Sequence, residues 1–396
     1  MNYIWCGVAT GNGQLTLAIM DANSNVLAKT STYIQLVDIK QMYERWTVGD
    51  DPSTAPTSTA QIATNDLPSG VLWPFRYANP GNANTPYVLY VHGWNLEYWE
   101  KDRWAESAFK RLYWQGYQGR FGVFRWPTDN GFSGKISVLT DARNYDNSEF
   151  QAWQSAQGLL NKLANLNAQY SGHVYLMAHS MGNVVAGEAL RRASSQLVNA
   201  YVAMQGAVPA HCYDATTANR SSSGPPDCYA AYWTNGAPCY FNGTAGAGSY
   251  INFYNTNDWA LSYWNLDQDP FKPDNSGLPF PGYYYTTPSG THPSGFYKII
   301  GSTDYDLYFP ASTYEIFAYA DRAWSYALGA QAHVGGAFKK GSSYQEVDLP
   351  SVWPADTHPH SPGNLYTAHV WHSAQFRSDN MSRAVFWNTL MEQMFP

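Results

Sequence analysis

The segment Val174–Leu190, VYLMAHSMGNVVAGEAL, constrains the fold of this chain more than any other feature. An apolar run typical of a buried strand passes directly into a helical pattern, and Ser180 stands at the junction. Such a junction forces a sharp, strained turn that lifts the serine hydroxyl above the edge of a sheet. Small residues must flank the turn, and Ala178 and Gly182 do so. The pattern indicates a nucleophilic serine; the alternative is that Ser180 only caps the following helix.

Strand and helix patterns alternate on both sides of this junction. Buried strands are predicted over 87–91, 122–126, 173–178, 198–204 and 250–254, and helices over 99–117, 148–170 and 181–195. We also expect a helix over 313–328, a last strand near 365–370 and a closing helix over 380–395. Strands that alternate with helices predict an α/β fold, with a mostly parallel central sheet and helices on both faces.

The regions around this pattern define the expected domain organisation. Residues 1–46 form an N-terminal β-rich segment, in which 13–39 predicts strand, turn, strand and a helical turn. Residues 47–80 begin with a stretch rich in Pro, Ser, Thr and Asp and are expected to be a linker. The main domain, 81–396, carries long insertions near 207–249, 264–310 and 329–364, whose aromatic residues argue against disorder.

Charge and hydropathy exclude two classes of partner and favour one location. The net charge of -7 leaves no basic footprint for nucleic acid, and no apolar stretch is long enough to predict a membrane span. With 13% charged and 16% aromatic residues, the composition is more typical of a secreted protein. Residues 1–10 do not resemble a signal peptide, so we expect a mature form or a fragment of a longer precursor.

The cysteines and histidines do not form a recognisable metal site. No pair of cysteines has C-x-x-C spacing, and both a disulfide and free buried thiols remain open. His358 and His360 lack a carboxylate or cysteine at ligand spacing, so we expect no metal and no cofactor. The four cysteines are Cys6, Cys212, Cys228 and Cys239.

A second motif precedes Ser180 by about ninety residues. The predicted strand 87–91 ends in His92-Gly93-Trp94-Asn95, where Gly93 permits a tight turn. In a fold with a strand–serine–helix turn, the loop after such a strand supplies one oxyanion-hole N–H and the residue after the serine supplies the other. These donors are expected to be the backbones of Trp94 and Met181. The alternative is that His92 is simply a polar residue at a strand end.

Three stretches together carry a family resemblance. HGWN at 92–95, FRWPT at 124–128 and AHSMGN at 178–183 look like the lipase and esterase side of the α/β-hydrolase superfamily. The form A-H-S-M-G resembles that of certain bacterial lipases, and Ala178 departs from the G-x-S-x-G pattern by one methyl group. The resemblance covers 86–264, reaches the C-terminal third through one histidine motif, and excludes the first 80 residues. It implies an α/β-hydrolase fold with Ser, acid and His in that order along the chain.

The acid is expected after a late strand. Asp258 lies four residues beyond the predicted strand 250–254 and is our candidate, although it could also cap a short helix. The rivals are Asp214, in the cysteine-containing loop, and Asp267 and Asp269, in an irregular Pro-rich stretch.

The base is expected between the last strand and the closing helix. His372 begins the stretch HSAQF and lies beyond the predicted strand, whereas His369 lies within it, so His372 is our candidate. His333, His358 and His360 are weaker candidates in the irregular stretch.

These residues predict a Ser180–His372–Asp258 triad and hydrolysis of esters through an acyl-enzyme. A carboxylester hydrolase of the esterase or lipase type is our first hypothesis. The aromatic insertions would suit a hydrophobic or aromatic ester as its substrate. An amide or peptide hydrolase with the same triad is an alternative. A further alternative is a non-catalytic α/β-hydrolase-like binding module, which would have no need of all three residues.

Overall fold

The computed structural model describes residues 11–36, 39–48, 64–65, 83–128, 138–208, 246–255, 261, 328–330, 343–349, 372–376 and 382–396. The predicted strand near 365–370, the helix predicted over 313–328 except for its last residue, and all four cysteines lie outside these ranges. Within them, no helix is long and apolar enough to cross a membrane.

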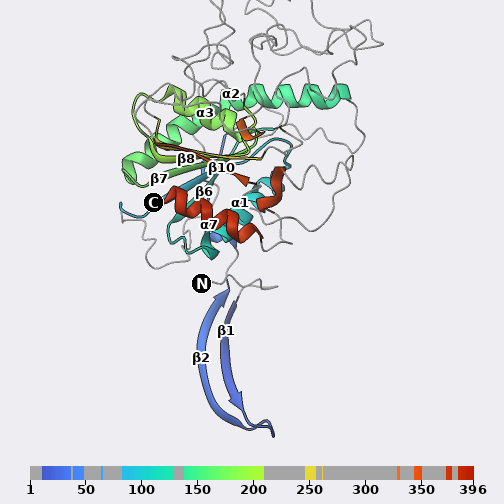
Figure 1. Cartoon of the computed structure of the whole chain (residues 1–396), viewed down its shortest axis with the longest axis vertical. Coiled ribbons are helices and arrows are strands. Elements are labelled where there is room, and N and C mark those ends of the chain that lie inside the picture. The colour runs from blue at the N-terminus through green and yellow to red at the C-terminus, as the bar shows by residue number, and fades with distance from the viewer. Residues whose placement is uncertain are drawn as a thin grey trace, which may run out of the picture.

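An eight-stranded sheet forms the centre of the molecule, in the order β10-β9-β8-β7-β5-β6-β3-β4 (Figure 1). Every neighbouring pair runs parallel except β3 with β4. The strands are β3 (Glu44–Thr47), β4 (Thr64–Asn65), β5 (Tyr87–Val91), β6 (Arg120–Arg125), β7 (Val174–His179), β8 (Val198–Met204), β9 (Ala247–Tyr254) and β10 (Ser343–Asp348). The predicted mostly parallel sheet is therefore confirmed.

The order of the strands reverses at β5, and this fixes where a site can form. From β5 the chain goes to β6 on one side and then returns to β7 on the other side. The loops that leave the carboxyl ends of β5 and β7 consequently diverge, and a crevice at such a switch point is the usual place for a ligand in an open parallel sheet. Those two loops carry His92 and Ser180.

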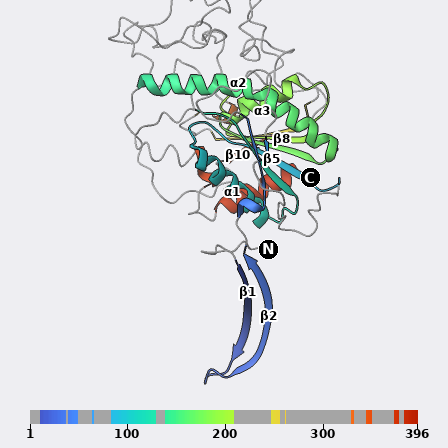
Figure 2. The same cartoon turned by 180° about the vertical axis from the view of Figure 1, so that it is seen from behind.

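Helices cover both faces of the sheet (Figure 2). The helices α2 (Val138–Gln169) and α3 (Gly182–Arg192) lie on one face, and α1 (Tyr98–Trp114) and α7 (Ser382–Met394) lie on the other. Two apolar cores result, one on each face, because alternate residues of each strand point to opposite sides. In β5, Leu89 belongs to the core beneath α2 and α3, while Val88 and Tyr90 belong to the other.

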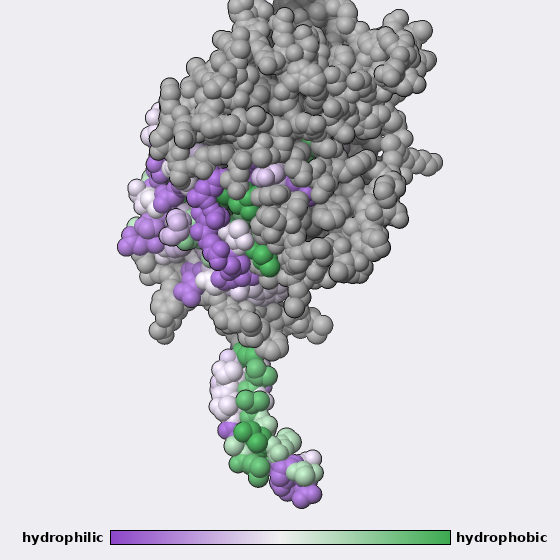
Figure 3. All heavy atoms as spheres, viewed as in Figure 1, coloured by the Kyte–Doolittle hydropathy of each residue, from purple (hydrophilic) through white to green (hydrophobic). Residues whose placement is uncertain are grey.

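The N-terminal segment forms the predicted strand–turn–strand unit. Strands β1 (Gly11–Met20) and β2 (Val26–Leu36) pair antiparallel and extend away from the sheet domain (Figure 1). In the turn, the Asp21 carboxylate accepts hydrogen bonds from the backbone N–H of Asn23 and of Asn25, each at 2.8 Å. Exposed apolar side chains, among them Leu15 and Leu17, run along the hairpin (Figure 3).

Three strands of the main sheet, β3, β4 and β10, were not predicted from the sequence. The two-residue β4 lies within the stretch 47–80 that was expected to be a linker. The boundary expected at residue 46 falls inside β3, which pairs with β6 in the main sheet, and β10 lies within the stretch 329–364 that was expected to be irregular. Strands β3 and β10 are short and carry polar residues, as in ERWT and SYQEVD, so they give no buried-strand pattern. Their place in the sheet comes from pairing with β6 and β9, which the local sequence does not encode.

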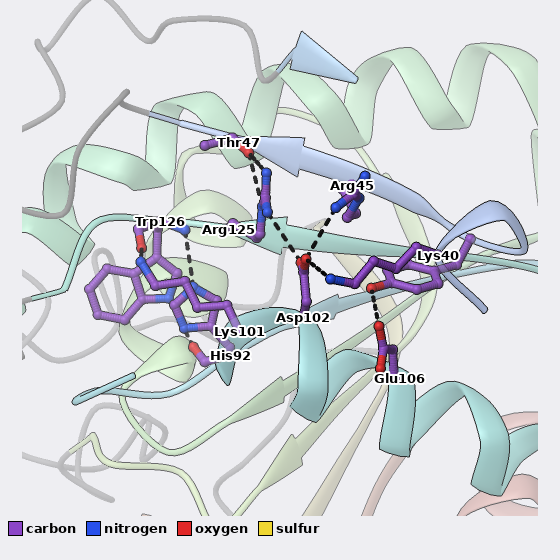
Figure 4. Close-up of polar contacts among 10 residues, drawn as sticks. Lys40, Arg45, Thr47, His92, Lys101, Asp102, Glu106, Arg125 and Trp126 are labelled. Atoms are coloured by element: carbon purple, nitrogen blue, oxygen red, sulfur yellow. Dashed lines mark hydrogen bonds and ion pairs between the residues drawn. The ribbon is translucent and has the colours of Figure 1, made fainter. Parts of the chain in front are cut away.

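A buried ion cluster ties β3 and β6 to α1 (Figure 4). The Asp102 carboxylate in α1 contacts Arg125 of β6 and Arg45 of β3, each at 3.1 Å, and Lys40 at 3.5 Å. The Arg125 guanidinium also donates to Thr47 Oγ1 at 2.6 and 3.0 Å. Asp102 and Arg125 are both buried. One carboxylate therefore compensates the cations of three separate elements.

We predict that Asp102→Asn destabilises the protein by about 3–5 kcal/mol, because it leaves the buried Arg125 guanidinium without its counter-charge. Lys40→Met is the matched control, since the Lys40 side chain is 43% exposed and its loss should cost no more than about 1 kcal/mol. Urea unfolding of both variants measures the difference. Equal effects of the two substitutions would contradict a central role for Asp102.

Candidate active site

Ser180 occupies a strained turn between β7 and α3. Its φ of +52° lies in the left-handed region, which serine rarely adopts and which costs on the order of 1–3 kcal/mol. Backbone hydrogen bonds hold the turn: Ser180 N–H donates to Met204 O at 3.1 Å, and Ser180 O accepts from Ala207 N–H at 3.0 Å. Ser180 itself is partly exposed. The strained strand–serine–helix junction that the sequence predicts is present.

Asn183, the second residue of α3, stabilises this junction, and the sequence analysis did not assign it a role. Its buried side-chain amide donates to Ser180 O at 2.8 Å and to Ala178 O at 3.2 Å. The Tyr201 hydroxyl donates in turn to Asn183 Oδ1 at 2.5 Å. A polar residue directly after the small-residue turn and before the apolar run Val184–Ala186 is the signal that could have found it.

Two glycines let residues 92–97, which connect β5 to α1 and are called the β5 loop, approach Ser180 closely. A Cβ added to Gly182 would lie 2.4 Å from His92 O and 2.7 Å from Val91 O, so α3 begins in direct contact with the end of β5. A Cβ added to Gly93 would lie 2.9 Å from Ser180 Cβ. No larger residue fits at either position without a shift of the backbone.

The two expected oxyanion donors lie on either side of this contact. Trp94 follows Gly93 in the β5 loop, and its side chain is partly buried against the core beneath α2 and α3. Met181 follows Ser180 directly and is fully buried. Met181 is thus bonded to Ser180, and Trp94 is bonded to Gly93, which faces Ser180 Cβ; their role as donors remains a prediction.

His92 is a buried, hydrogen-bonded residue that holds the β5 loop. Its Nδ1 lies 2.7 Å from Gly93 O, its Nε2 lies 3.2 Å from Trp126 N, and its ring stacks on the Trp126 indole at 5.3 Å. A backbone N–H can only donate, so Nε2 accepts and Nδ1 carries the proton that is donated to Gly93 O. Burial, with the charges of Lys101 and Arg125 nearby, holds the pKa of His92 well below its ordinary value. The ring is therefore neutral, and it supports the loop.

His372, the expected base, lies beside the turn that carries Ser180. Its ring is 4.9 Å from the ring of His179, the residue before Ser180, and His179 Nε2 donates to His372 O at 2.9 Å. His179 also packs against Trp104 and Phe376, with ring centroids 5.5 and 5.1 Å away. Burial, and then the neighbouring His372, holds the pKa of His179 well below its ordinary value. The structure thus brings the expected base and the expected nucleophile to the same end of the sheet.

The remaining candidates lie outside the described residues. Asp258 follows β9, which ends at Tyr254, and Asn255 N–H donates to Gly329 O at 2.8 Å just before it. The other residues outside are His369, Asp214, Asp267, Asp269, His333, His358 and His360. Among the residues that the structure describes, no group of three or more His, Cys, Asp or Glu side chains could hold a metal ion.

Comparison with known proteins finds one family model that matches part of the sheet domain. Residues 81–208 match the model of the family described as "Alpha/beta hydrolase of unknown function (DUF900)". The matched segment runs from the approach to β5 through Ser180 to the end of β8. The α/β-hydrolase fold predicted from the sequence is therefore confirmed. No curated protein matches the chain.

Several solved structures are also similar, each at 14% sequence identity. The ydeN gene product from B. subtilis aligns over 44% of this chain and 74% of its own, with a TM-score of 0.26. Aspergillus fumigatus lipase B aligns over 53% of this chain and 46% of its own, with a TM-score of 0.27. Esterase PE8 aligns over 44% of this chain and 72% of its own, with a TM-score of 0.25.

We predict that His92 makes stability fall on the acid side. The pKa of His92 is depressed in the folded protein, so below about pH 6.5 His92 is protonated in the unfolded chain but stays neutral in the folded protein. Stability is therefore complete above pH 6.5 and falls as the pH drops below it, by up to about 1.4 kcal/mol per pH unit from this group. His92→Gln should be less stable than wild type at pH 7.5, and the gap should narrow towards pH 5.

Urea unfolding at several pH values measures this gap. His173→Gln, at a partly exposed histidine outside the β5 loop, is the control and should keep the wild-type pH dependence. Parallel curves for wild type and His92→Gln would contradict the assignment of His92 as a buried neutral residue.

Proposed function

From the α/β-hydrolase fold of this chain we propose that it is a serine carboxylester hydrolase of the esterase or lipase type. The observation that carries the proposal is the conformation of Ser180, with a φ of +52° at the switch point of the sheet and with the β5 loop against its Cβ. A strained serine that is partly exposed has no evident structural use. Strain of this kind is retained where a nucleophile must stand clear of the sheet.

The proposed mechanism uses an acyl-enzyme. His372 accepts the Ser180 proton as the hydroxyl attacks the ester carbonyl, and Asp258 orients the imidazole and stabilises the imidazolium. The backbone N–H groups of Trp94 and Met181 stabilise the negative charge that develops on the carbonyl oxygen. The alcohol leaves with the proton from His372, and a water molecule then hydrolyses the acyl-enzyme to release the carboxylic acid.

The substrate is proposed to be a hydrophobic or aromatic ester. The aromatic-rich stretches 207–249 and 264–310 follow β8 and β9, whose carboxyl ends lie at the same edge of the sheet as Ser180. Low charge and abundant Tyr, Trp and Asn favour action outside the cell. Two of the similar structures are themselves a lipase and an esterase by name.

We predict that the purified protein hydrolyses p-nitrophenyl esters and that Ser180→Ala lowers kcat by at least about 10⁴-fold without unfolding the protein. Ser194→Ala, at an exposed serine beyond α3, is the matched control and should keep the wild-type rate. A series of acyl chain lengths distinguishes an esterase from a lipase. A folded wild type that turns over anilides or peptides instead would favour an amide hydrolase, and one without any turnover would favour a binding module.

A second set of variants identifies the base and the acid. We expect His372→Ala and Asp258→Asn each to lower kcat by about 10³-fold or more, because each removes a member of the proposed triad. His369→Ala and His173→Ala should retain most of the rate. Steady-state kinetics on one ester substrate measures all four variants, with circular dichroism as the check on folding. If His369→Ala is the inactive variant, the assignment of His372 is wrong.

A further inference from the structure

The segment 124–128, FRWPT, lies against the β5 loop through contacts that the proposed triad does not use. The Trp126 indole N–H donates to His92 O at 2.8 Å, and the Trp126 backbone N–H donates to His92 Nε2. Thr128 Oγ1 lies 3.5 Å from the Leu96 backbone N–H. Trp126 thus holds His92 at two points, and Thr128 contacts the far end of the same loop.

A buried lysine hydrogen-bonds to the backbone of Trp126 and so stabilises its contact with His92. The Lys101 ammonium, in the first turns of α1, donates to Trp126 O at 2.8 Å and is almost completely buried (Figure 4). Burial of an ammonium group is costly unless its hydrogen bonds are made. Position 101 accordingly links α1 to the end of β6, next to the ion pair between Asp102 and Arg125.

The hydrogen bonds of Lys101, Trp126 and His92 form a chain that ends at the peptide group between Gly93 and Trp94. His92 Nδ1–H donates to Gly93 O, and Gly93 C=O shares its peptide unit with the N–H of Trp94. The unit is trans, since the described residues contain no cis peptide bond, so its C=O and N–H point in opposite directions. Fixing the carbonyl therefore fixes the direction of the N–H, which is the expected oxyanion donor from the β5 loop.

We propose that Trp126 and Lys101 are positioning residues for the oxyanion hole, which act through His92 on the peptide between Gly93 and Trp94. The inference rests on the proposed function, because it assigns a task within that reaction. Both side chains are buried, so we expect neither to contact the substrate. Lys101 holds the Trp126 carbonyl, Trp126 holds His92 through its two N–H groups, and His92 holds the Gly93 carbonyl.

The reason for such support is the steep dependence of catalysis on donor geometry. An oxyanion donor contributes about 100- to 1000-fold in rate, but only if it is aligned before the charge develops. Glycine at 93 gives the close approach to Ser180 and also leaves the backbone permissive. The hydrogen bonds from His92 and Trp126 supply the rigidity that Gly93 cannot.

The test compares an ester with its thionoester, in which sulfur replaces the carbonyl oxygen and accepts hydrogen bonds poorly. Trp126→Phe keeps the stacked ring and the backbone N–H but removes the hydrogen bond to His92 O. We expect kcat/KM for the p-nitrophenyl ester to fall about 10-fold, while the thionoester rate changes little, so that the ratio of the two falls about 10-fold. Lys101→Met, which removes the donor to Trp126 O, should lower the same ratio.

Trp46→Phe is the matched control. It also removes one indole hydrogen bond, from Trp46 Nε1 to the Tyr87 hydroxyl at 3.0 Å, but does so away from the β5 loop. Its ratio should equal that of wild type. The fraction of active enzyme in every preparation is titrated with a fluorophosphonate, because partial unfolding would lower both rates equally and leave the ratio unchanged.

The outcomes separate this inference from the proposed function. Folded Trp126→Phe and Lys101→Met variants with the wild-type ratio would overturn the inference and leave the hydrolase intact. If Trp126→Phe does not fold, the ratio of the ester rate to the thionoester rate is measured for Lys101→Met alone, and a wild-type value overturns the inference. If neither folds, the contacts support the domain as a whole and the inference is wrong. A wild type without ester turnover overturns the proposed function and this inference together.

Discussion

The contact between the end of β5 and the start of α3 is the constraint on which the rest of the site depends. With no room for a side chain at Gly182, the helix begins directly against the backbone of Val91 and His92. This contact brings the β5 loop over Ser180 and requires the chain to turn sharply between β7 and α3. The strain at Ser180 is offset by hydrogen bonds from Asn183 and by the packing of both strands into two cores.

Two histidines near the serine are held neutral and serve as structural polar groups. His92 bridges Gly93 and Trp126, and His179 reaches the backbone of His372. Burial lowers the pKa of both rings, so neither is suited to carry the proton of a hydrolytic reaction at neutral pH. His92 thus contacts the segment that follows β6, and His179 contacts the segment that begins at His372.

The parts of the fold that sequence predicts well are those with a strong local pattern. The strands β5, β7 and β8 are short apolar runs and α3 carries an apolar stripe, so their positions could be predicted to within a few residues. The end of α2 was predicted equally well, but the helix begins at Val138 and not at the predicted residue 148. The antiparallel hairpin was also predicted, because Asp21 and the asparagines that follow it give a turn signal. The strands β3, β4 and β10 could not be predicted, since these short polar strands at the two ends of the sheet acquire their structure from pairing with their neighbours.

The sequence by itself determined the fold class and the position of the serine, because a strand that runs into a helix across a small-residue turn has few ways to fold. It also indicated the β5 loop, through the glycine that follows His92. Only the tertiary structure decided what surrounds them. Trp126, Lys101 and Asn183 are far from one another in the sequence, and their contacts with the loop and the turn depend on how β6, α1 and α3 pack. The hydrogen bonds of Lys101 and Trp126 join residues 25 and 34 positions apart and leave no periodic trace in the chain, so they become visible only once the sheet is assembled.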